Sequence, residues 1–369
     1  MSQLHSRAWP LVATVFLFTF IFLQTSFAAT QGSSNPDISV NALFLYKNSN
    51  RGYDPNAANR NGVNVQEAEI QFASDVDPYW RFVGTFSMSQ APDDAKLAQT
   101  PSVYSPKWQF EPEEAYAESL DFTVFTLRVG KFKAAMGKHN QLHTHAYPFI
   151  DAPLQNQVLL GDEGLNDTGA SVAALLPLSW FSEISVQGFS GQTPDDTYFL
   201  SSAPGNFVGL VHFKNLWDLS DELTAEFGVS GASGQNSASG STNLYGADLT
   251  FKWRQSLEKA VIWSTEILHR DYQTSTNEKG DGFASWVQFQ PARRWWFEVR
   301  GEYLQIRDQA TSTISPFQRK QSAVAAFDPS EFSEVRVQYD HLNDVSMKDE
   351  HRAMLQFNYT IGAHPAHSY

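Results

Sequence analysis

The sequence predicts an all-β fold, a transmembrane antiparallel β-barrel of about 16 strands. Three observations predict it. Apolar and polar residues alternate over long stretches, the connections between stretches are short and long in turn, and one face of the stretches carries charges of both signs. Globular strands usually run about five or six residues, whereas membrane-crossing strands need about nine to eleven. Because many stretches exceed ten residues, a membrane barrel is favoured over a soluble β-sandwich.

The alternation is clearest near the end of the chain. Ala353, Leu355, Phe357, Tyr359 and Ile361 share one face, and polar residues occupy most of the other face. A helix would scatter these apolar residues around its circumference. The expected strands lie near 37–47, 62–73, 80–90, 108–120, 122–132, 167–176, 181–190, 207–215, 221–231, 241–254, 259–270, 281–290, 295–307, 319–328, 331–343 and 350–361.

The connections predict two different ends for the barrel. Short connections such as 75–79 and 291–294 carry Pro, Asp and other turn-forming residues, whereas 91–107, 133–166, 191–206 and the Gly/Ser-rich 232–240 are long. Outer-membrane barrels have tight turns in the periplasm and longer loops outside. Aromatic residues that suit a membrane interface cluster where the short turns meet strands: Tyr79, Trp80, Trp180, Trp217, Trp295 and Trp296.

Residues 1–28 have the pattern of a secretory signal peptide. Arg7 precedes a run of 13 mostly apolar residues, 11–23, and small residues at Ser26 and Ala28 fit a cleavage site. The run is shorter than the ~20 residues that a transmembrane helix needs. We therefore expect an exported chain of residues 29–369, which forms the barrel.

Composition excludes several classes of function. The chain has 26 Lys and Arg against 40 Asp and Glu, so its net charge of -14 argues against nucleic acid as a partner. It has no cysteine, which excludes thiolate catalysis and cysteine metal sites.

The signal peptide, the sixteen stretches and the end at 355–361 resemble Gram-negative outer-membrane porins. Such barrels typically finish with an amphipathic strand and a terminal aromatic residue. This chain ends in Tyr369 but places seven residues, 362–368, after the last alternating stretch. The resemblance implies a location in the outer membrane, contact with its lipid bilayer, passage of small solutes or ions, and a homotrimer.

Residues 137–154 and 362–367 resemble a narrower family of poorly characterised outer-membrane proteins, sometimes labelled zinc-regulated receptors. TonB-dependent receptors place a plug domain inside a 22-stranded barrel. Residues 29–369, which number 341, cannot supply both parts, so energised transport is not expected.

A barrel of sixteen strands encloses a lumen too wide to be filled by the side chains of its wall, so water should enter. The sequence therefore predicts a passive porin, and the excess of acidic residues favours cations. The expected pore-lining residues are Arg81, Arg128, Glu226, Asp248, Lys252, Arg254, Glu298, Arg300, Glu302, Glu334, Arg336 and Asp340.

The longest connection, 133–166, resembles the third loop of general porins, which folds into the lumen and forms the constriction. Carboxylates at a constriction favour cations. The alternative is that the acidic residues of this loop, Asp151, Asp162 and Glu163, lie on its outer surface. The residues that the loop would bring to the pore are His139, His143, His145, Asp151, Asp162 and Glu163.

The histidines of this loop suggest a metal site. His143 and His145 are two apart and point to one side of an extended chain, and His139 and Asp151 could complete a site for zinc or another divalent cation. No local spacing matches a strong metal motif. Histidines that bind the loop to the wall explain the cluster equally well, and no other cofactor is expected.

Other functions remain open. One is a barrel for binding or uptake of divalent metal, and another is a surface-binding barrel whose loops hold a ligand. An outer-membrane hydrolase is the third, but the sequence has no Gly-x-Ser-x-Gly nucleophile motif, so an enzyme is not expected.

Overall fold

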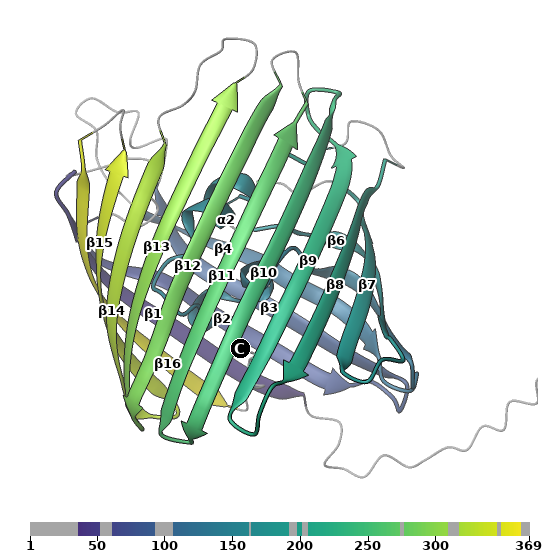
Figure 1. Cartoon of the computed structure of the whole chain (residues 1–369), viewed down its shortest axis with the longest axis horizontal. Coiled ribbons are helices and arrows are strands. Elements are labelled where there is room, and N and C mark those ends of the chain that lie inside the picture. Colours follow the sequence, from purple (N-terminus) through teal and green to yellow (C-terminus); the bar gives the residue numbers. More distant parts are fainter. Residues whose placement is uncertain are drawn as a thin grey trace, which may run out of the picture. The chain divides into compact units, whose positions relative to one another are not determined.

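Sixteen antiparallel strands close into a barrel in the computed structural model (Figure 1). The structure describes residues 36–51, 61–92, 106–161, 164–191, 198–200, 206–273, 277–308, 317–344 and 348–362. Each strand pairs with its neighbours in sequence, and the first strand pairs with the last to close the sheet. The predicted fold and strand number are confirmed, whereas the predicted signal peptide lies outside the described residues.

Every predicted stretch overlaps one strand. The strands are β1 (Asp37–Ser49), β2 (Gly62–Asp75), β3 (Trp80–Pro92), β4 (Pro106–Ser119), β5 (Phe125–Lys133), β6 (Asn166–Leu175), β7 (Phe181–Phe189), β8 (Val208–Asp218), β9 (Leu223–Gln235), β10 (Ser241–Ser256), β11 (Lys259–Tyr272), β12 (Glu278–Ala292), β13 (Trp295–Asp308), β14 (Gln318–Ser330), β15 (Ser333–Asp344) and β16 (Glu350–Gly362).

Apolar side chains face outward and polar side chains face the lumen. On β13, Val299 is 58% exposed, whereas the neighbouring Arg300 is 3% exposed. Phe227, Val337 and Phe357 are likewise exposed on the outer face. This is the reverse of a soluble β-protein, and it suits a wall with lipid outside and a polar interior.

The short connections lie at the lower edge of the barrel in Figure 1. Asp77 shapes one of them, because its Oδ1 atom accepts hydrogen bonds from the backbone N–H groups of Tyr79 (2.8 Å) and Trp80 (2.9 Å). Trp180 and Trp295 are exposed beside these turns, as an interface aromatic requires. No helix in the described part of the chain is long and apolar enough to cross a bilayer.

One predicted long connection is wrong. Residues 232–240 were expected as a loop, but β9 continues to Gln235, so only 236–240 remain between β9 and β10. Asn236 makes this turn tight, because its Oδ1 atom accepts the N–H groups of Ala238 and Gly240.

Residues 134–165 connect β5 and β6, and we call them the lumen loop. Its described residues, 134–161 and 164–165, fold into the barrel. They contain two 3-10 turns, η1 (His139–Gln141) and η2 (Thr144–Ala146), and one short helix, α2 (Leu154–Leu159). Figure 1 draws α2 within the outline of the barrel, and α2 contacts β11, β12 and β13. The main hydrophobic core therefore lies inside the barrel, between this loop and the inner wall. Its members include Phe132, Met136, Leu159, Phe189, Leu244, Leu268 and Leu304.

Two glycines allow this close approach. Gly137 has a φ of +72°, and a Cβ atom there would lie 2.2 Å from Oε1 of Glu266 on β11. A Cβ atom on Gly282 of β12 would lie 2.3 Å from Cβ of Gln155 in α2. A larger residue at either position would push the loop away from the wall.

Candidate functional site

The lumen loop is fastened to the inner wall through its backbone. Glu266 on β11 accepts hydrogen bonds from the N–H groups of Lys138 (2.8 Å) and His139 (3.2 Å). Farther along, Oε1 of Gln338 on β15 accepts the N–H of Ile150 (2.7 Å), and Glu302 on β13 accepts the N–H of Leu154 (2.5 Å). Buried backbone groups need such partners, so these wall residues fix the path of the loop.

One part of the loop contacts acidic side chains of the wall. We call this cluster the acidic latch; it consists of His143 and His145 of the loop, Glu67 and Glu69 of β2, and Glu113 and Glu114 of β4. His143 Nδ1 lies 2.8 Å from Glu113 Oε2 and 3.0 Å from Glu69 Oε2, and His143 Nε2 lies 3.0 Å from Glu114 Oε2. Burial lowers the pKa of His143, but the charge of Glu69 and the hydrogen bonds with all three carboxylates together raise it well above its usual value. The imidazolium therefore ties the loop to two strands.

Two β-bulges place the acids of this latch. On β4, Thr85 is opposite Glu114 and Phe86 is opposite Pro112, so Glu113 is an extra residue. The consecutive Glu113 and Glu114 are both buried on the lumen side. Gln66 is the corresponding extra residue on β2.

Gln66 and its neighbour Glu67 also reach the loop together. The side chain of Gln66 donates to the carbonyl of Ile150 (3.0 Å), and the hydroxyl of Thr144 donates to Glu67 (2.9 Å). Each bulge thus turns two consecutive polar side chains toward the same loop.

Another part of the loop contacts basic side chains of the wall. We call this cluster the basic latch; it consists of Asp151 of the loop with Arg300 (β13), Lys320 (β14) and Arg352 (β16). Oδ1 of Asp151 lies 2.7 Å from Arg300 Nη2. Oδ2 of Asp151 lies 2.5 Å from Lys320 Nζ and 3.9 Å from Arg352 Nη1. Burial raises the pKa of Asp151, but the charges of Lys320, Arg300 and Arg352 hold it well below its usual range. Arg300 also stacks on the ring of Phe149 at 4.3 Å.

A cavity of about 80 Å³ separates the loop from the wall of β8, β9 and β10. Lys138 from the loop lies 3.3 Å from Glu226, and Lys214 of β8 lies 3.6 Å from the same carboxylate. Asp248 and His212 complete the charged lining. Charges of both signs therefore border the space between loop and wall.

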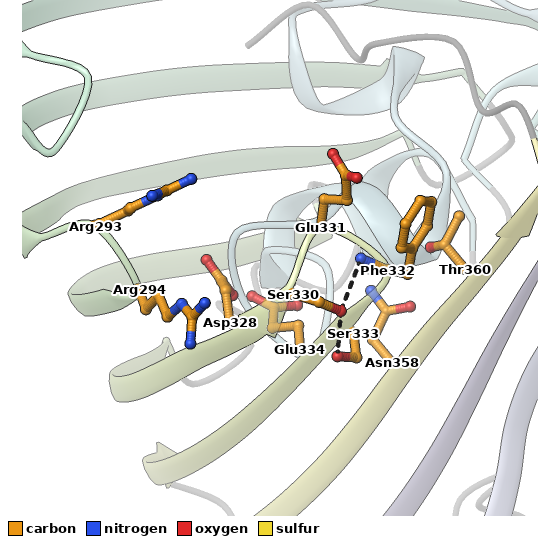
Figure 2. Close-up of a pocket in the computed structure, with 10 residues that line it drawn as sticks. All are labelled: Arg293, Arg294, Asp328, Ser330, Glu331, Phe332, Ser333, Glu334, Asn358 and Thr360. Carbon is orange, nitrogen blue, oxygen red and sulfur yellow. Dashed lines mark hydrogen bonds between the residues drawn. The ribbon is translucent and has the colours of Figure 1, made fainter.

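A wider cavity of about 520 Å³ opens among the short turns (Figure 2). Arg293 and Arg294 come from one turn, and Asp328, Glu331 and Glu334 come from another turn and its flanking strands. The wall at this end is thus lined by both signs of charge.

Most of the expected pore-lining residues lie on the lumen side, in different environments. Asp248, Glu298, Glu302 and Asp340 are buried there beside the loop or its wall contacts, as are Arg300 and Arg336. Arg128 pairs with Glu118 at 2.6 Å, while Glu226, Lys252, Glu334 and Arg81 are partly exposed and Arg254 is exposed. The sequence could not distinguish residues that hold the loop from residues that border free space.

The structure does not assemble the predicted set of four metal ligands. His143 and His145 come together, but Asp151 is engaged with three cations of the basic latch. His139 packs against Tyr147 at 4.4 Å between ring centres, and burial, with Arg300 and Lys133 nearby, lowers its pKa to about 3. Asp162 and Glu163 lie outside the described residues.

Comparison with known proteins supports the fold. No family model matches the chain. An uncharacterised protein of Aquifex aeolicus is 26% identical over 357 residues, which cover 84% of this chain and 71% of that protein. OmpF of Salmonella typhi, solved with daunomycin, superposes with a TM-score of 0.59 at 11% identity, covering 88% of this chain and 97% of its own.

Two further solved structures agree. A loop-deletion mutant of OmpT, an outer membrane protein of Vibrio cholerae, gives a TM-score of 0.58 at 9% identity, covering 89% of this chain and 99% of its own. The outer membrane channel DcaP of Acinetobacter baumannii gives 0.55 at 12% identity, covering 89% and 96%. The chain has the fold of an outer-membrane porin.

Proposed function

We propose that the protein is a passive porin of the outer membrane, a diffusion channel for small solutes or ions with a preference for cations. The observation that carries the proposal is the closed wall, apolar outside and polar inside, with one loop fastened across its interior. The side chains of the wall cannot fill a barrel of this width, and a loop fastened across the interior narrows it.

The acidity of the chain supports the cation preference. Asp and Glu number 40 against 26 Lys and Arg, and a low-dielectric wall focuses the resulting field on the lumen. Asp151 adds nothing to it, because three cations of the basic latch compensate its charge. Glu226 and Asp248, which border the cavity beside the loop, are the carboxylates best placed to act on a passing ion.

The proposal includes how the protein reaches its place. Residues 1–28 would be removed on export, and residues 29–369 would insert into the outer membrane. The simplest assembly is a homotrimer, as in the trimer form of in-vitro folded OmpT of Vibrio cholerae. Mass spectrometry of the protein from outer membranes tests the cleavage after Ala28, and cross-linking in detergent tests the trimer. No enzymatic activity is part of this function.

The decisive experiment is conductance of the purified protein in planar lipid bilayers. We expect stepwise single channels, and under a salt gradient a reversal potential with the sign of cation selectivity. Insertion without conductance would contradict the porin, and an anion-selective reversal potential would contradict the preference. Liposome swelling with neutral sugars then measures the size of solute that passes.

A further inference from the structure

The acidic latch brings metal-ligating atoms from three parts of the chain into two overlapping sets. The ligand atoms of Glu69, Glu113 and His143 lie within 4.8 Å of one another, and so do those of Glu67, Glu69 and His145. The two sets share Glu69. Nδ1 of His143 and Nδ1 of His145 approach the same oxygen, Oε2 of Glu69, at 3.0 and 3.4 Å.

A second carboxylate prepares one histidine for coordination. Nε2 of His143 lies 3.0 Å from Oε2 of Glu114. The other oxygen of Glu114, Oε1, accepts a hydrogen bond from the backbone N–H of Lys133 (3.1 Å). A histidine that donates Nε2–H to a carboxylate presents Nδ1 with its lone pair to a metal ion, and this arrangement is usual around metal-bound imidazoles. Glu114 therefore orients His143 rather than coordinating.

The cluster is rich in carboxylates. Glu67, Glu69, Glu113 and Glu114 lie around the imidazoles of His143 and His145. Among the described residues, Oε1 of Glu69 is buried with no hydrogen-bond partner, and Glu69 as a whole is 1% exposed. Burying a carboxylate oxygen without a partner is costly, and a coordinated cation removes that cost.

We propose that the acidic latch is a binding site for one divalent transition-metal ion of the zinc type, in which small side-chain movements join the two sets so that His143, His145, Glu69 and Glu113 coordinate the ion. Two imidazoles and two carboxylates suit Zn²⁺ and its neighbours, whereas Ca²⁺ and Mg²⁺ prefer oxygen ligands alone. The bound ion joins η2 of the lumen loop to β2 and β4, so it stabilises the loop in the lumen. This inference is independent of the proposed function, because the site can bind metal whether or not the barrel conducts.

The test is zinc titration of the folded protein in detergent after treatment with a chelator. Isothermal titration calorimetry should give one tight Zn²⁺ site per chain, and Mg²⁺ or Ca²⁺ at the same concentration should not compete. X-ray absorption of the loaded protein should show two imidazoles with oxygen ligands. The melting temperature should rise with zinc, because the ion binds only the folded state.

Variants locate the site. His143→Ala with His145→Ala should weaken zinc binding by about a hundredfold or more, and Glu113→Gln, which keeps the shape of the side chain, by about tenfold. The matched control is His341→Ala with His351→Ala, which removes another stacked histidine pair (4.7 Å between ring centres) outside the lumen loop and should leave the tight site intact.

Two results would overturn the inference. One is the absence of a tight zinc site in the wild-type protein. The other is a zinc affinity that stays at the wild-type value in the His143/His145 double variant or in Glu113→Gln, or that is lost in the His341/His351 control. Since Glu113→Gln leaves His143 in place, it decides the matter even if the double variant does not fold.

Discussion

The two latches of the lumen loop are electrostatic opposites. In the acidic latch, His143 lies among carboxylates of β2 and β4. In the basic latch, Asp151 lies among cations of β13, β14 and β16. The loop therefore brings a histidine to a group of wall carboxylates at one place and a carboxylate to wall cations at another, and those cations also pair with Glu302 and Asp340 of the wall.

The difference matters because the two walls respond differently when the loop residue is lost. Carboxylates that lose their cation can take up protons or bind another cation. Guanidinium groups cannot lose their protons in a protein, so Arg300 and Arg352 stay charged when Asp151 is lost and keep only wall carboxylates such as Glu302 and Asp340 as partners. The basic latch should therefore be the more sensitive of the two, and the acidic latch the more adaptable.

Asp151→Asn should have the largest effect. It removes the charge that Arg300 and Lys320 share, and breaking a buried ion pair from one side costs about 3 kcal/mol or more. Denaturant unfolding in detergent measures the loss, and single-channel records should become noisier as the loop loosens. Asp349→Asn, at an exposed acid, is the control and should change the stability by less than about 0.5 kcal/mol. Equal effects of the two variants would refute the importance of the latch.

The same variant gives a pH test. The folded pKa of Asp151 is lowered, so its stabilisation is present above the unfolded value of about 3.9 and is lost as the pH falls through the folded value. The stability difference between wild type and Asp151→Asn should thus be constant from about pH 7 to pH 4 and shrink only in stronger acid. A difference that fades between about pH 7 and pH 5 would contradict this assignment.

His143→Ala should cost less in metal-free protein, about 1 to 2 kcal/mol, because the freed carboxylates can adapt. The same unfolding experiment measures it, with His341→Ala as a control at a more exposed histidine. A loss greater than that of Asp151→Asn would reverse the order of the two latches.

The smallest expected effect is on ion selectivity. Glu226→Gln removes a carboxylate from the cavity beside the loop, and Lys138→Gln removes the cation that pairs with it. Reversal potentials should shift toward anions in the first variant and toward cations in the second. Shifts in the same direction, or none in either, would mean that ions take another path.

Much of this architecture follows from the period of two in the sequence, but the latches do not. Alternation placed Arg300, Glu302 and Asp340 on the lumen side, because a strand without a bulge keeps its phase. The bulges at Gln66 and Glu113 add one residue each and shift that phase, so Glu113 and Glu114 both face the lumen although they are consecutive. No local pattern marks such a shift.

The partners of the loop were equally beyond the sequence. Asp151 meets side chains from three strands that lie between 149 and 201 residues further along the chain. Only the closed barrel brings them together. The length of the connection and its resemblance to a porin loop predicted that it enters the lumen, but not which wall residues hold it.

The most direct test of the central claim, that the described residues of the lumen loop lie inside the barrel, is an engineered disulfide. The chain has no cysteine, so Leu159→Cys with Gly280→Cys introduces a single pair. A Cβ atom on Gly280 of β12 would lie 3.7 Å from Cγ of Leu159, within reach of a bond after small adjustments. We predict that oxidation links the two residues in the folded protein and leaves the single-channel conductance unchanged. A folded barrel in which this pair does not form under oxidation would place the loop elsewhere and contradict the account.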